Sequence, residues 1–292
     1  MKKPNAYASD SILNELVKFL ESKLDKCGLY YRLFARYKTD ESIKRKLAAK
    51  NYSHETGYLM QDFIGIRIAL YFCDDIPICR ELILSSFDVL NISETRHSSQ
   101  TFEATRLNLV CKIPDQFLEL FESHLWTQYP FDKTFEVQIR TVFSEGWHEV
   151  EHDVRYKCKE DWVPHADLDR TLNGILATLE NCDWSILALV KDLAYREYKS
   201  GQWSEMMKNK MRIHLANTKL SDAIISVFNG NTALAKKFYR CDRQEILLQL
   251  LHNKLRFPLT ADNMIYFINT VSVNSPEISE ITPPQFLRFV DM

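Results

Sequence analysis

Hydrophobic and polar positions follow two different periods along this chain. Between residues 12 and 24 apolar residues recur at three- and four-residue intervals, which predicts an amphipathic helix that Asp10 can cap. Residues 40–50 predict a second helix. Residues 63–72 (FIGIRIALYF) are instead rich in β-branched and aromatic side chains, which favours a mostly buried strand.

Two later segments alternate between apolar and polar residues, as strands with one buried face do. The alternation covers residues 105–113 and, more regularly, residues 134–141. Successive side chains of a strand point to opposite faces of its sheet. Glu136, Gln138 and Arg140 are therefore expected to project from one face.

Helical periodicity returns after these strands. It covers residues 142–157 and 166–198, and beyond Gly201 the pattern is helical throughout. Strands grouped in the middle of a chain with helices around them predict an α+β fold, here a mixed β-sheet flanked by helices. We expect one domain over residues 1–200 and a helical C-terminal region over residues 201–292.

Capping signals mark two helix starts in the C-terminal region. Thr260 can cap the segment that follows it, and Thr282 and Gln285 have the spacing of a capping box. Basic residues scattered over the region permit contact with RNA: Lys208, Lys210, Arg212, Lys236, Lys237, Arg240 and Arg243. Oligomerisation and binding of a partner protein are the alternatives for this region.

The composition limits the chemistry. Only 7 of the 292 residues are glycine and none lies next to another, so neither a G-x-G-x-x-G turn nor a P-loop is present, and phosphates must be held by side chains.

The longest apolar stretch, residues 63–72, is interrupted by Arg67 and is too short for a membrane span. Seven scattered cysteines without a C-x-x-C pair favour reduced thiols. We expect a cytoplasmic protein.

One motif points to zinc. His148, Glu149 and His152 match H-E-x-x-H, in which two histidines one helical turn apart bind Zn²⁺ and the glutamate activates water. The extension that supplies a third ligand in metzincins is absent, and the surrounding segment is highly charged. A zinc metalloprotease is a remote alternative.

A second constellation suits magnesium and a triphosphate. Asp62 stands at the head of one predicted strand and Glu136 on the polar face of another, and Arg36, Lys38 and Lys46 lie upstream in a basic segment. Mg²⁺ prefers one or two carboxylates together with phosphate oxygens, and transferred phosphates need cationic groups around them. Each residue alone has a structural explanation, because polar strand faces and basic helices are common.

The order of these motifs is more specific than any one of them. Arg36 and Lys38 are followed by Ser42 and Lys46, then by DFIGIR (62–67), by FEVQIR (135–140), and finally by Trp147, His152 and Lys157. In this order, residues 10–200 resemble the synthetase domain of the RelA/SpoT alarmone synthetases, in particular the small single-domain members. The resemblance implies the nucleotidyltransferase-like fold of that family.

The resemblance also implies a reaction, in which pyrophosphate passes from ATP to the 3′-hydroxyl of GDP or GTP and AMP is released, as in the stringent response. Asp62 and Glu136 would be the catalytic residues and would bind Mg²⁺, and Glu136 is the alternative acceptor of the hydroxyl proton. Five residues would bind ATP, with the last of them stacked on adenine: Arg36, Lys38, Ser42, Lys46 and Arg67. Five others would line the acceptor side: Asn108, Gln138, Arg140, His152 and Lys157.

One segment departs from the family. Where members carry F-G-Y-R-S-[LIV]-H, this chain has Glu103 in place of the glycine, Ala104 in place of the tyrosine and Asn108 in place of the histidine, while Phe102 is kept. The tyrosine stacks on guanine in the family, and such a stack contributes about 1–3 kcal/mol. Guanine affinity is therefore expected to fall unless another aromatic side chain substitutes.

Three interpretations follow from this departure. The enzyme transfers pyrophosphate to a differently placed acceptor, such as another nucleotide or, as in toxin-like members, the 3′ end of tRNA. It makes the usual guanosine alarmones weakly. Alternatively, it is a degenerate synthetase that binds a nucleotide or partner without turnover. A toxin-like member would have an antitoxin-like protein partner, and a homo-oligomer is also expected.

Overall fold

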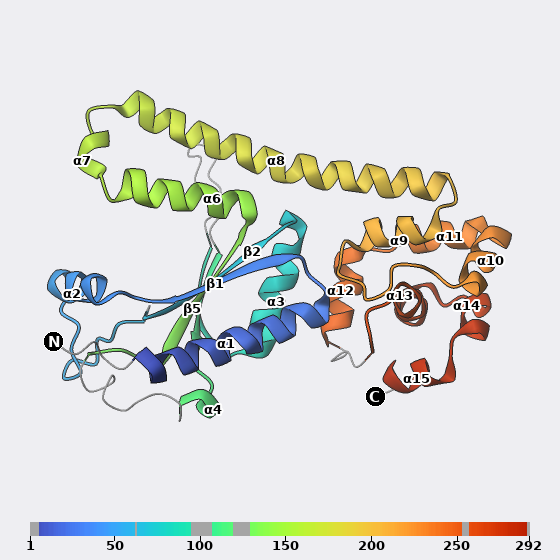
Figure 1. Ribbon diagram of the computed structural model, residues 1–292, viewed down its shortest axis with the longest axis horizontal. Coiled ribbons are helices and arrows are strands. Elements are labelled where there is room, and N and C mark those ends of the chain that lie inside the picture. Colours follow the sequence, from blue (N-terminus) through green and yellow to red (C-terminus); the bar gives the residue numbers. More distant parts are fainter. Residues whose placement is uncertain (1–5, 62, 95–106, 119–128, 253–256, 291–292) are drawn as a thin grey trace. The chain divides into compact units, whose positions relative to one another are not determined.

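A computed structural model describes residues 6–61, 63–94, 107–118, 129–252 and 257–290 (Figure 1). The chain divides into two compact units. The first contains Met1–Ser22, Tyr31–Tyr71 and Cys79–Glu180, and the second contains Lys23–Tyr30, Phe72–Ile78 and Asn181–Met292. The second unit thus includes two short segments from the N-terminal part of the chain. The domain boundary expected at residue 200 stays a prediction.

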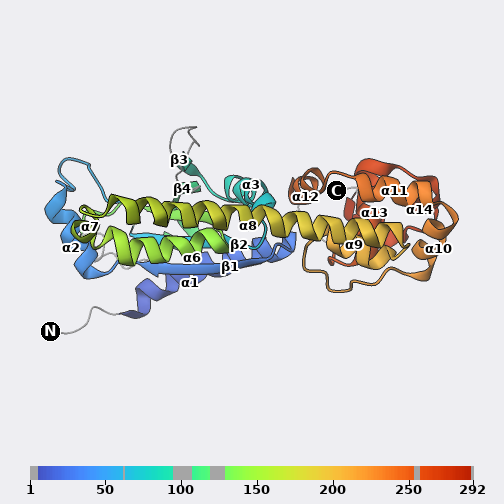
Figure 2. The ribbon, with the colours of Figure 1, turned by 90° about the horizontal axis from the view of Figure 1, so that it is seen from above.

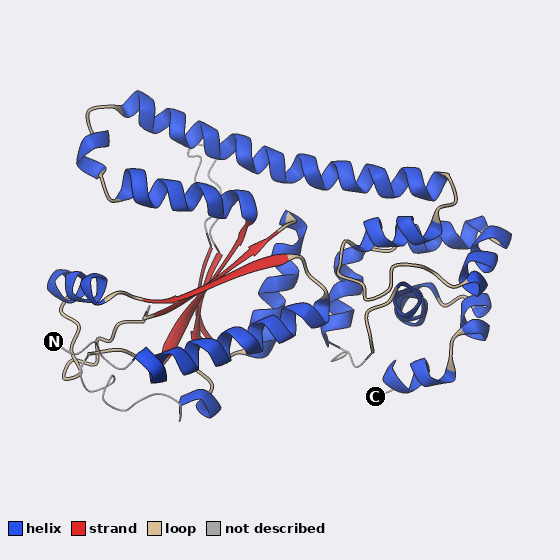
Figure 3. Cartoon of the chain, viewed as in Figure 1, coloured by secondary structure: helices blue, strands red, loops and turns tan. Residues whose placement is uncertain are grey.

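The first unit is built on a five-stranded sheet in the order β1-β2-β5-β4-β3. Its central pair, β2 and β5, is parallel, and the other neighbours are antiparallel. This mixed sheet with helices around it confirms the predicted α+β class (Figure 3). The strands are β1 (Tyr31–Tyr37), β2 (Ile64–Leu70), β3 (Val89–Glu94), β4 (Leu107–Lys112) and β5 (Thr134–Thr141).

One face of the sheet forms the core of the first unit. Apolar residues from β2, β4 and β5 are buried on it, among them Ile66, Leu109 and Val137. Helices α1 (Ala6–Cys27) and α3 (Ile76–Ser86) cover this face, and Phe87 at the end of α3 packs edge-on against Phe135 of β5 at 5.0 Å between ring centroids. The opposite face carries the polar side chains of the same strands.

Two helices follow strands of this sheet in the chain. Helix α2 (Asp40–Ala49) begins after Thr39, whose side chain accepts a hydrogen bond from the Ser42 N–H at 3.3 Å. Helix α6 (Val142–Val150) follows β5 directly, and the Thr141 side chain caps its N-terminus by accepting from the Ser144 N–H. The helix continues as the π-helix η2 (Glu151–Tyr156). The remaining helices of this part of the chain are α4 (Asp115–Leu118), α7 (Lys159–Trp162) and the long α8 (Ala166–Lys199).

Helix α6 packs against the first part of α8. Trp147 of α6 is buried with Leu176 of α8, and Leu172 and Leu179 complete the apolar cluster. The two helices run side by side in both views (Figures 1 and 2). This packing fixes α6 next to the sheet that it follows.

The second unit is helical in its described residues, as the C-terminal periodicity predicts. After α8 come α9 (Trp203–Met211), α10 (Asp222–Gly230), α11 (Thr232–Arg240), α12 (Arg243–His252), α13 (Ala261–Ile268) with the π-helix η3 (Asn269–Val273), α14 (Pro276–Ile281) and α15 (Pro284–Val290). Thr260 caps α13, since its hydroxyl accepts a hydrogen bond from the Asn263 N–H at 3.2 Å.

Two capping predictions are wrong. Helix α1 begins at Ala6, so Asp10 lies inside the helix and does not cap it. Thr282 ends α14, and its hydroxyl donates to the carbonyl oxygen of Ile278 at 2.7 Å. Helix α15 starts at Pro284, so Pro283 and not Thr282 stands directly before it.

Four buried or half-buried charges hold the second unit together. Arg212, at the end of α9, pairs with Asp74 at 2.6 Å, and Arg243, at the start of α12, pairs with Asp75 at 2.7 Å. Arg243 Nε also donates to the Met211 carbonyl at 2.6 Å. Burial raises the pKa of the Asp75 carboxyl, and the Arg243 charge opposes that rise. The cluster fastens the Cys73–Asp75 turn (η1) to helices that lie far along the chain.

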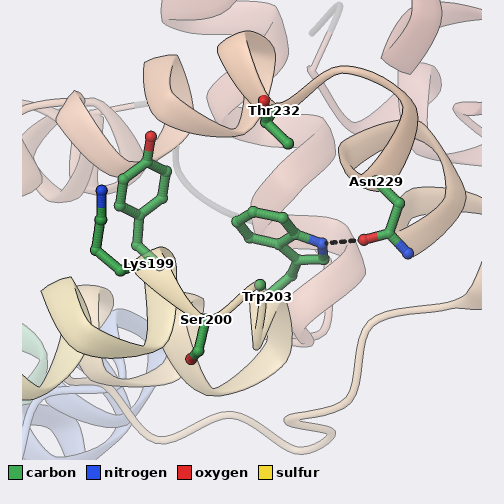
Figure 4. A pocket seen from close by; sticks show the side chains of 7 residues that line it. Lys199, Ser200, Trp203, Asn229 and Thr232 are labelled. Carbon is green, nitrogen blue, oxygen red and sulfur yellow. Dashed lines mark hydrogen bonds between the residues drawn. The ribbon is translucent and has the colours of Figure 1, made fainter.

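The second unit also contains a pocket of about 380 Å³ near the end of α8 (Figure 4). Lys199, Ser200, Trp203, Asn229 and Thr232 are among its lining residues. The indole N–H of Trp203 donates to Asn229 Oδ1 at 2.8 Å, which fixes the ring as a wall of the pocket. None of the candidate site residues lines it.

The cysteines agree with the expectation of reduced thiols. None of the seven cysteines, all of which lie in the described ranges, forms a disulfide, and burial raises the pKa of the Cys111 thiol to about 12, which makes it unreactive at neutral pH. None of the helices in the described ranges combines the length and apolar composition that a membrane crossing requires.

Candidate active site

The sheet register brings the candidate residues of three strands onto the polar face. Arg36 of β1 lies opposite Gly65 of β2, which lies opposite Glu136 of β5. A Cβ atom added to Gly65 would meet no atom within 4 Å, so the space between Arg36 and Glu136 is open. A ligand can therefore approach the sheet backbone between a cation and a carboxylate.

A second row of the sheet lies beside the first. Phe34, Arg67, Gln138 and Asn108 are successive register partners on β1, β2, β5 and β4. Phe34 is 52% exposed although it is aromatic. The polar face thus carries both a flat apolar ring and a planar guanidinium, the two kinds of group on which nucleobases stack.

Gln138 connects the arginines to the candidate catalytic carboxylate. Its Oε1 accepts from Arg67 Nε and from Arg140 Nη2, each at 3.1 Å. Arginine has only donors, so the amide oxygen must face the two guanidinium groups. The amide nitrogen then donates to Glu136 Oε2 at 3.1 Å. These contacts confirm that Glu136, Gln138 and Arg140 share one face.

Glu145 is a member of this network that the sequence did not indicate. It lies in the first turn of α6, its side chain is only 10% exposed, and it accepts from Arg67 Nη1 at 2.9 Å and from Arg140 Nη1 at 2.8 Å. Glu149, one turn later, also accepts from Arg67. Burial alone would lower the pKa of Arg67, but Glu145 and Glu149 raise it above its ordinary value.

The expected ATP-phosphate residues lie where β1 meets α2. Arg36 is exposed near the end of β1, and the backbone N–H of Lys38 donates to the Phe63 carbonyl at 2.9 Å, beside the start of β2. Ser42 lies in the first turn of α2, where its hydroxyl accepts from Thr39 at 2.9 Å. Lys46 follows four residues later on the same helical face.

His152 of η2 and Lys157, directly after η2, form a separate group. His152 Nδ1 and Lys157 Nζ lie 2.9 Å and 2.6 Å from Asp153 Oδ1. The Lys157 ammonium, with a smaller effect from His152, lowers the pKa of Asp153. Within the described residues, these contacts do not connect the pair with the sheet network.

The H-E-x-x-H residues have other partners. Glu149 contacts Arg67, His148 is buried, and His152 pairs with Asp153 on a π-helix rather than an α-helix. In the part of the chain that the structure describes, no three histidine, cysteine, aspartate or glutamate side chains gather as metal ligands.

Two expected parts of the site fall outside the described residues. They are Asp62 and the altered segment 102–105. Asn108, just after that segment, is half-buried on β4, and its Oδ1 is buried without a hydrogen-bond partner among the described residues.

The candidate carboxylates suit Mg²⁺ only when a bound substrate supplies phosphate oxygens as further ligands. Glu136 is half-buried, and its Oε2 is held by Gln138 beside the open space at Gly65. Mg²⁺ accepts one or two carboxylates when phosphate oxygens and waters complete its octahedron. Glu136, with Asp62 as its expected companion, would therefore hold the ion jointly with a bound triphosphate.

The same part of the chain matches a known family. Residues 35–161 match the model described as "Region found in RelA / SpoT proteins". Residues 35–161 therefore carry the RelA/SpoT region that the motif order predicts. The matched residues include the end of β1 and all of α2, β2, β5 and α6, the elements that carry the candidate site residues.

Individual relatives are more distant. The GTP pyrophosphokinase YjbM of Bacillus subtilis (strain 168) is 29% identical over 124 residues, which cover 42% of this chain and 54% of YjbM. Structures of the small alarmone synthetases 1 and 2 from Bacillus subtilis are each 21% identical, with TM-scores of 0.48 and 0.49. They cover 63% and 64% of this chain and 94% of their own lengths.

Proposed function

We propose that this protein is an ATP-dependent pyrophosphokinase that transfers pyrophosphate from ATP to the 3′-hydroxyl of a nucleotide. The observation that carries the proposal is the polar sheet face, on which Gln138 joins Arg67 and Arg140 to Glu136 beside the open space at Gly65. The family match over residues 35–161 supports it. YjbM, to which this chain is similar, is a GTP pyrophosphokinase.

In the proposed reaction, different parts of the polar face hold the ATP triphosphate and receive the acceptor's proton. The acceptor's 3′ oxygen attacks the β-phosphorus of ATP, the bond from that phosphorus to the α,β-bridging oxygen breaks, and AMP leaves. Glu136 takes the hydroxyl proton. Arg36, Lys38, Ser42 and Lys46 would hold the triphosphate from β1 and α2. Bound Mg²⁺ would neutralise the phosphate charge that the transfer requires.

Adenine would lie over Arg67. The carboxylates of Glu145 and Glu149 and the amide of Gln138 bind the edge of this guanidinium, so its flat face remains the surface for stacking. Phe34, the register partner of Arg67, would extend the stacking surface.

Two acceptors are candidates for this transfer. A guanosine nucleotide is the family's acceptor, and the 3′ end of tRNA is the alternative for a toxin-like member. The purified protein should be incubated with Mg²⁺ and β-labelled ATP, with GDP, GTP and deacylated tRNA offered in turn. We expect AMP release and transfer of label to one acceptor. Binding of ATP without transfer to any acceptor would support the non-catalytic alternative instead.

We also propose that the protein forms a homo-oligomer through α8. Ile186, Leu189 and Leu193 lie at three- and four-residue intervals on this helix and are 41%, 67% and 41% exposed. Such a stripe is suited to packing against another helix. An antitoxin-like partner and a cytoplasmic location stay predictions.

The oligomer can be tested by mass in solution. Leu189→Glu is expected to shift the protein to monomer in light scattering coupled to size exclusion, because a charge would be buried in the helix contact. Ala188→Glu, at an exposed neighbouring position, is the matched control and should leave the mass unchanged. A wild-type protein that is monomeric at all concentrations would contradict the proposal.

A further inference from the structure

Two arginines, a glutamate and a glutamine form a closed ring next to Glu136. Arg67 and Arg140 both donate to Gln138 Oε1, and both donate to Glu145, each to a different carboxylate oxygen. Every member of the ring therefore contacts two others. The side chains of Arg67, Arg140 and Glu145 are 19%, 9% and 10% exposed.

Glu145 supplies the negative charge that this ring needs. Two guanidinium groups that share one amide oxygen would repel each other in a partly buried place. A carboxylate that accepts from both, one oxygen each, compensates their charge and keeps both directed at Gln138. Glu149 compensates only Arg67, from a side chain that is 52% exposed.

The ring determines how Gln138 faces Glu136. An amide has one oxygen and one nitrogen end, and exchange of the two requires only rotation of the side chain. With both arginines on its oxygen, Gln138 must direct its nitrogen to Glu136 Oε2. If one arginine is released, the amide can turn, and its oxygen would then oppose the carboxylate oxygen of Glu136.

We propose that Glu145 is a positioning residue for the transfer reaction, acting on Glu136 through the two arginines and Gln138. The proposal rests on the function proposed above. Glu145 does not touch the reacting atoms. It keeps the Glu136 carboxylate in the orientation that receives the hydroxyl proton, and its effect on the rate therefore depends on Glu136 being present.

Glu145→Gln tests this role. The amide oxygen of the variant can accept from one arginine, but its NH₂ group must face the other, so one side of the ring is lost. We expect kcat to fall about 10- to 100-fold, the range that corresponds to loss of one charged hydrogen bond. The KM for the acceptor should change by less than about threefold, because Glu145 lies behind the ring.

Comparison variants distinguish a positioning role of Glu145 from a general structural role. Glu149→Gln removes the exposed partner of Arg67 and should lower kcat less than Glu145→Gln does. Glu160→Gln, on the exposed α7, should leave kcat unchanged. In a Glu136→Gln background, Glu145→Gln should have no further effect on the residual rate, whereas a purely structural residue would lower the rate in both backgrounds.

Each outcome decides the question. An active wild type whose kcat is unaffected by Glu145→Gln overturns the inference, and so does an equal loss in both backgrounds. A wild type that transfers no label overturns the proposed function and this inference with it. If Glu145→Gln does not fold, Arg140→Met opens the same ring from the other side and is expected to lower kcat by a similar factor.

Discussion

Replacement of Glu136 by glutamine is expected to stop pyrophosphate transfer while the protein stays folded. The amide oxygen of the new residue can still accept from Gln138, so the network keeps its hydrogen bond. The variant cannot take a proton from the acceptor hydroxyl, and it offers no charge to Mg²⁺. General base catalysis contributes about 10²- to 10⁴-fold, and kcat should fall by at least that factor.

The measurement is label transfer from β-labelled ATP, with circular dichroism to confirm the fold. Glu160→Gln is a matched control, since it makes the same chemical change on an exposed helix. ATP binding should persist in the Glu136 variant, because Arg36, Lys38 and Lys46 are unchanged. Transfer at the wild-type rate would show that Glu136 is not the catalytic carboxylate.

Replacement of Arg243 by methionine is expected to destabilise the second unit strongly. The change leaves Asp75, which is fully buried, without its partner at 2.7 Å, and it removes a hydrogen bond to the Met211 carbonyl. Loss of one partner of a buried ion pair costs about 3–5 kcal/mol. The midpoint of urea unfolding should fall accordingly.

A second replacement separates charge from packing. Asp75→Leu combined with Arg243→Met removes both charges, and it should recover much of the lost stability because no isolated carboxylate remains. Arg240→Ala, at an exposed position on α11, should change the midpoint little. If Arg243→Met were as mild as Arg240→Ala, the ion pair would have no stabilising role.

Regular periodicity predicted the central elements well. Strand β5 has the predicted bounds, 134–141, and α8 ends one residue beyond the predicted 198. Both elements have one strongly apolar face, which makes their period visible. The segment predicted as one helix over 142–157 continues beyond α6 as a π-helix. The sequence did not predict this change, because a shift in backbone hydrogen bonding does not alter the apolar pattern.

The edge strands were missed for a related reason. Strand β1 has no fully buried residue, so its alternation of half-exposed and exposed side chains resembles a surface segment. Strand β3 is exposed along nearly all of its length. The sequence therefore placed Arg36 in a basic segment but did not predict that it lies on the sheet, in register with Gly65 and Glu136.

The sequence indicated most members of the hydrogen-bond network on the polar face, but not their contacts. Motif order indicated Arg67, Glu136, Gln138 and Arg140, and the structure joins them in one network. Glu145 was missed because its role depends on arginines from two different strands, one of them 78 residues earlier in the chain. Nothing in the charged segment around Glu145 distinguishes it from its neighbours before the chain folds.

The buried pair of Asp75 and Arg243 also has a consequence for synthesis on the ribosome. The chain that leaves β2 carries Asp75 early, but its arginine partner emerges only after all strands of the sheet and all of α8, α9, α10 and α11 have been made. Until then the Cys73–Asp75 turn stays without its final contacts. A truncated chain that ends before α12 would therefore contain every strand of the sheet and Arg212, the partner of Asp74, yet leave the buried Asp75 without its arginine.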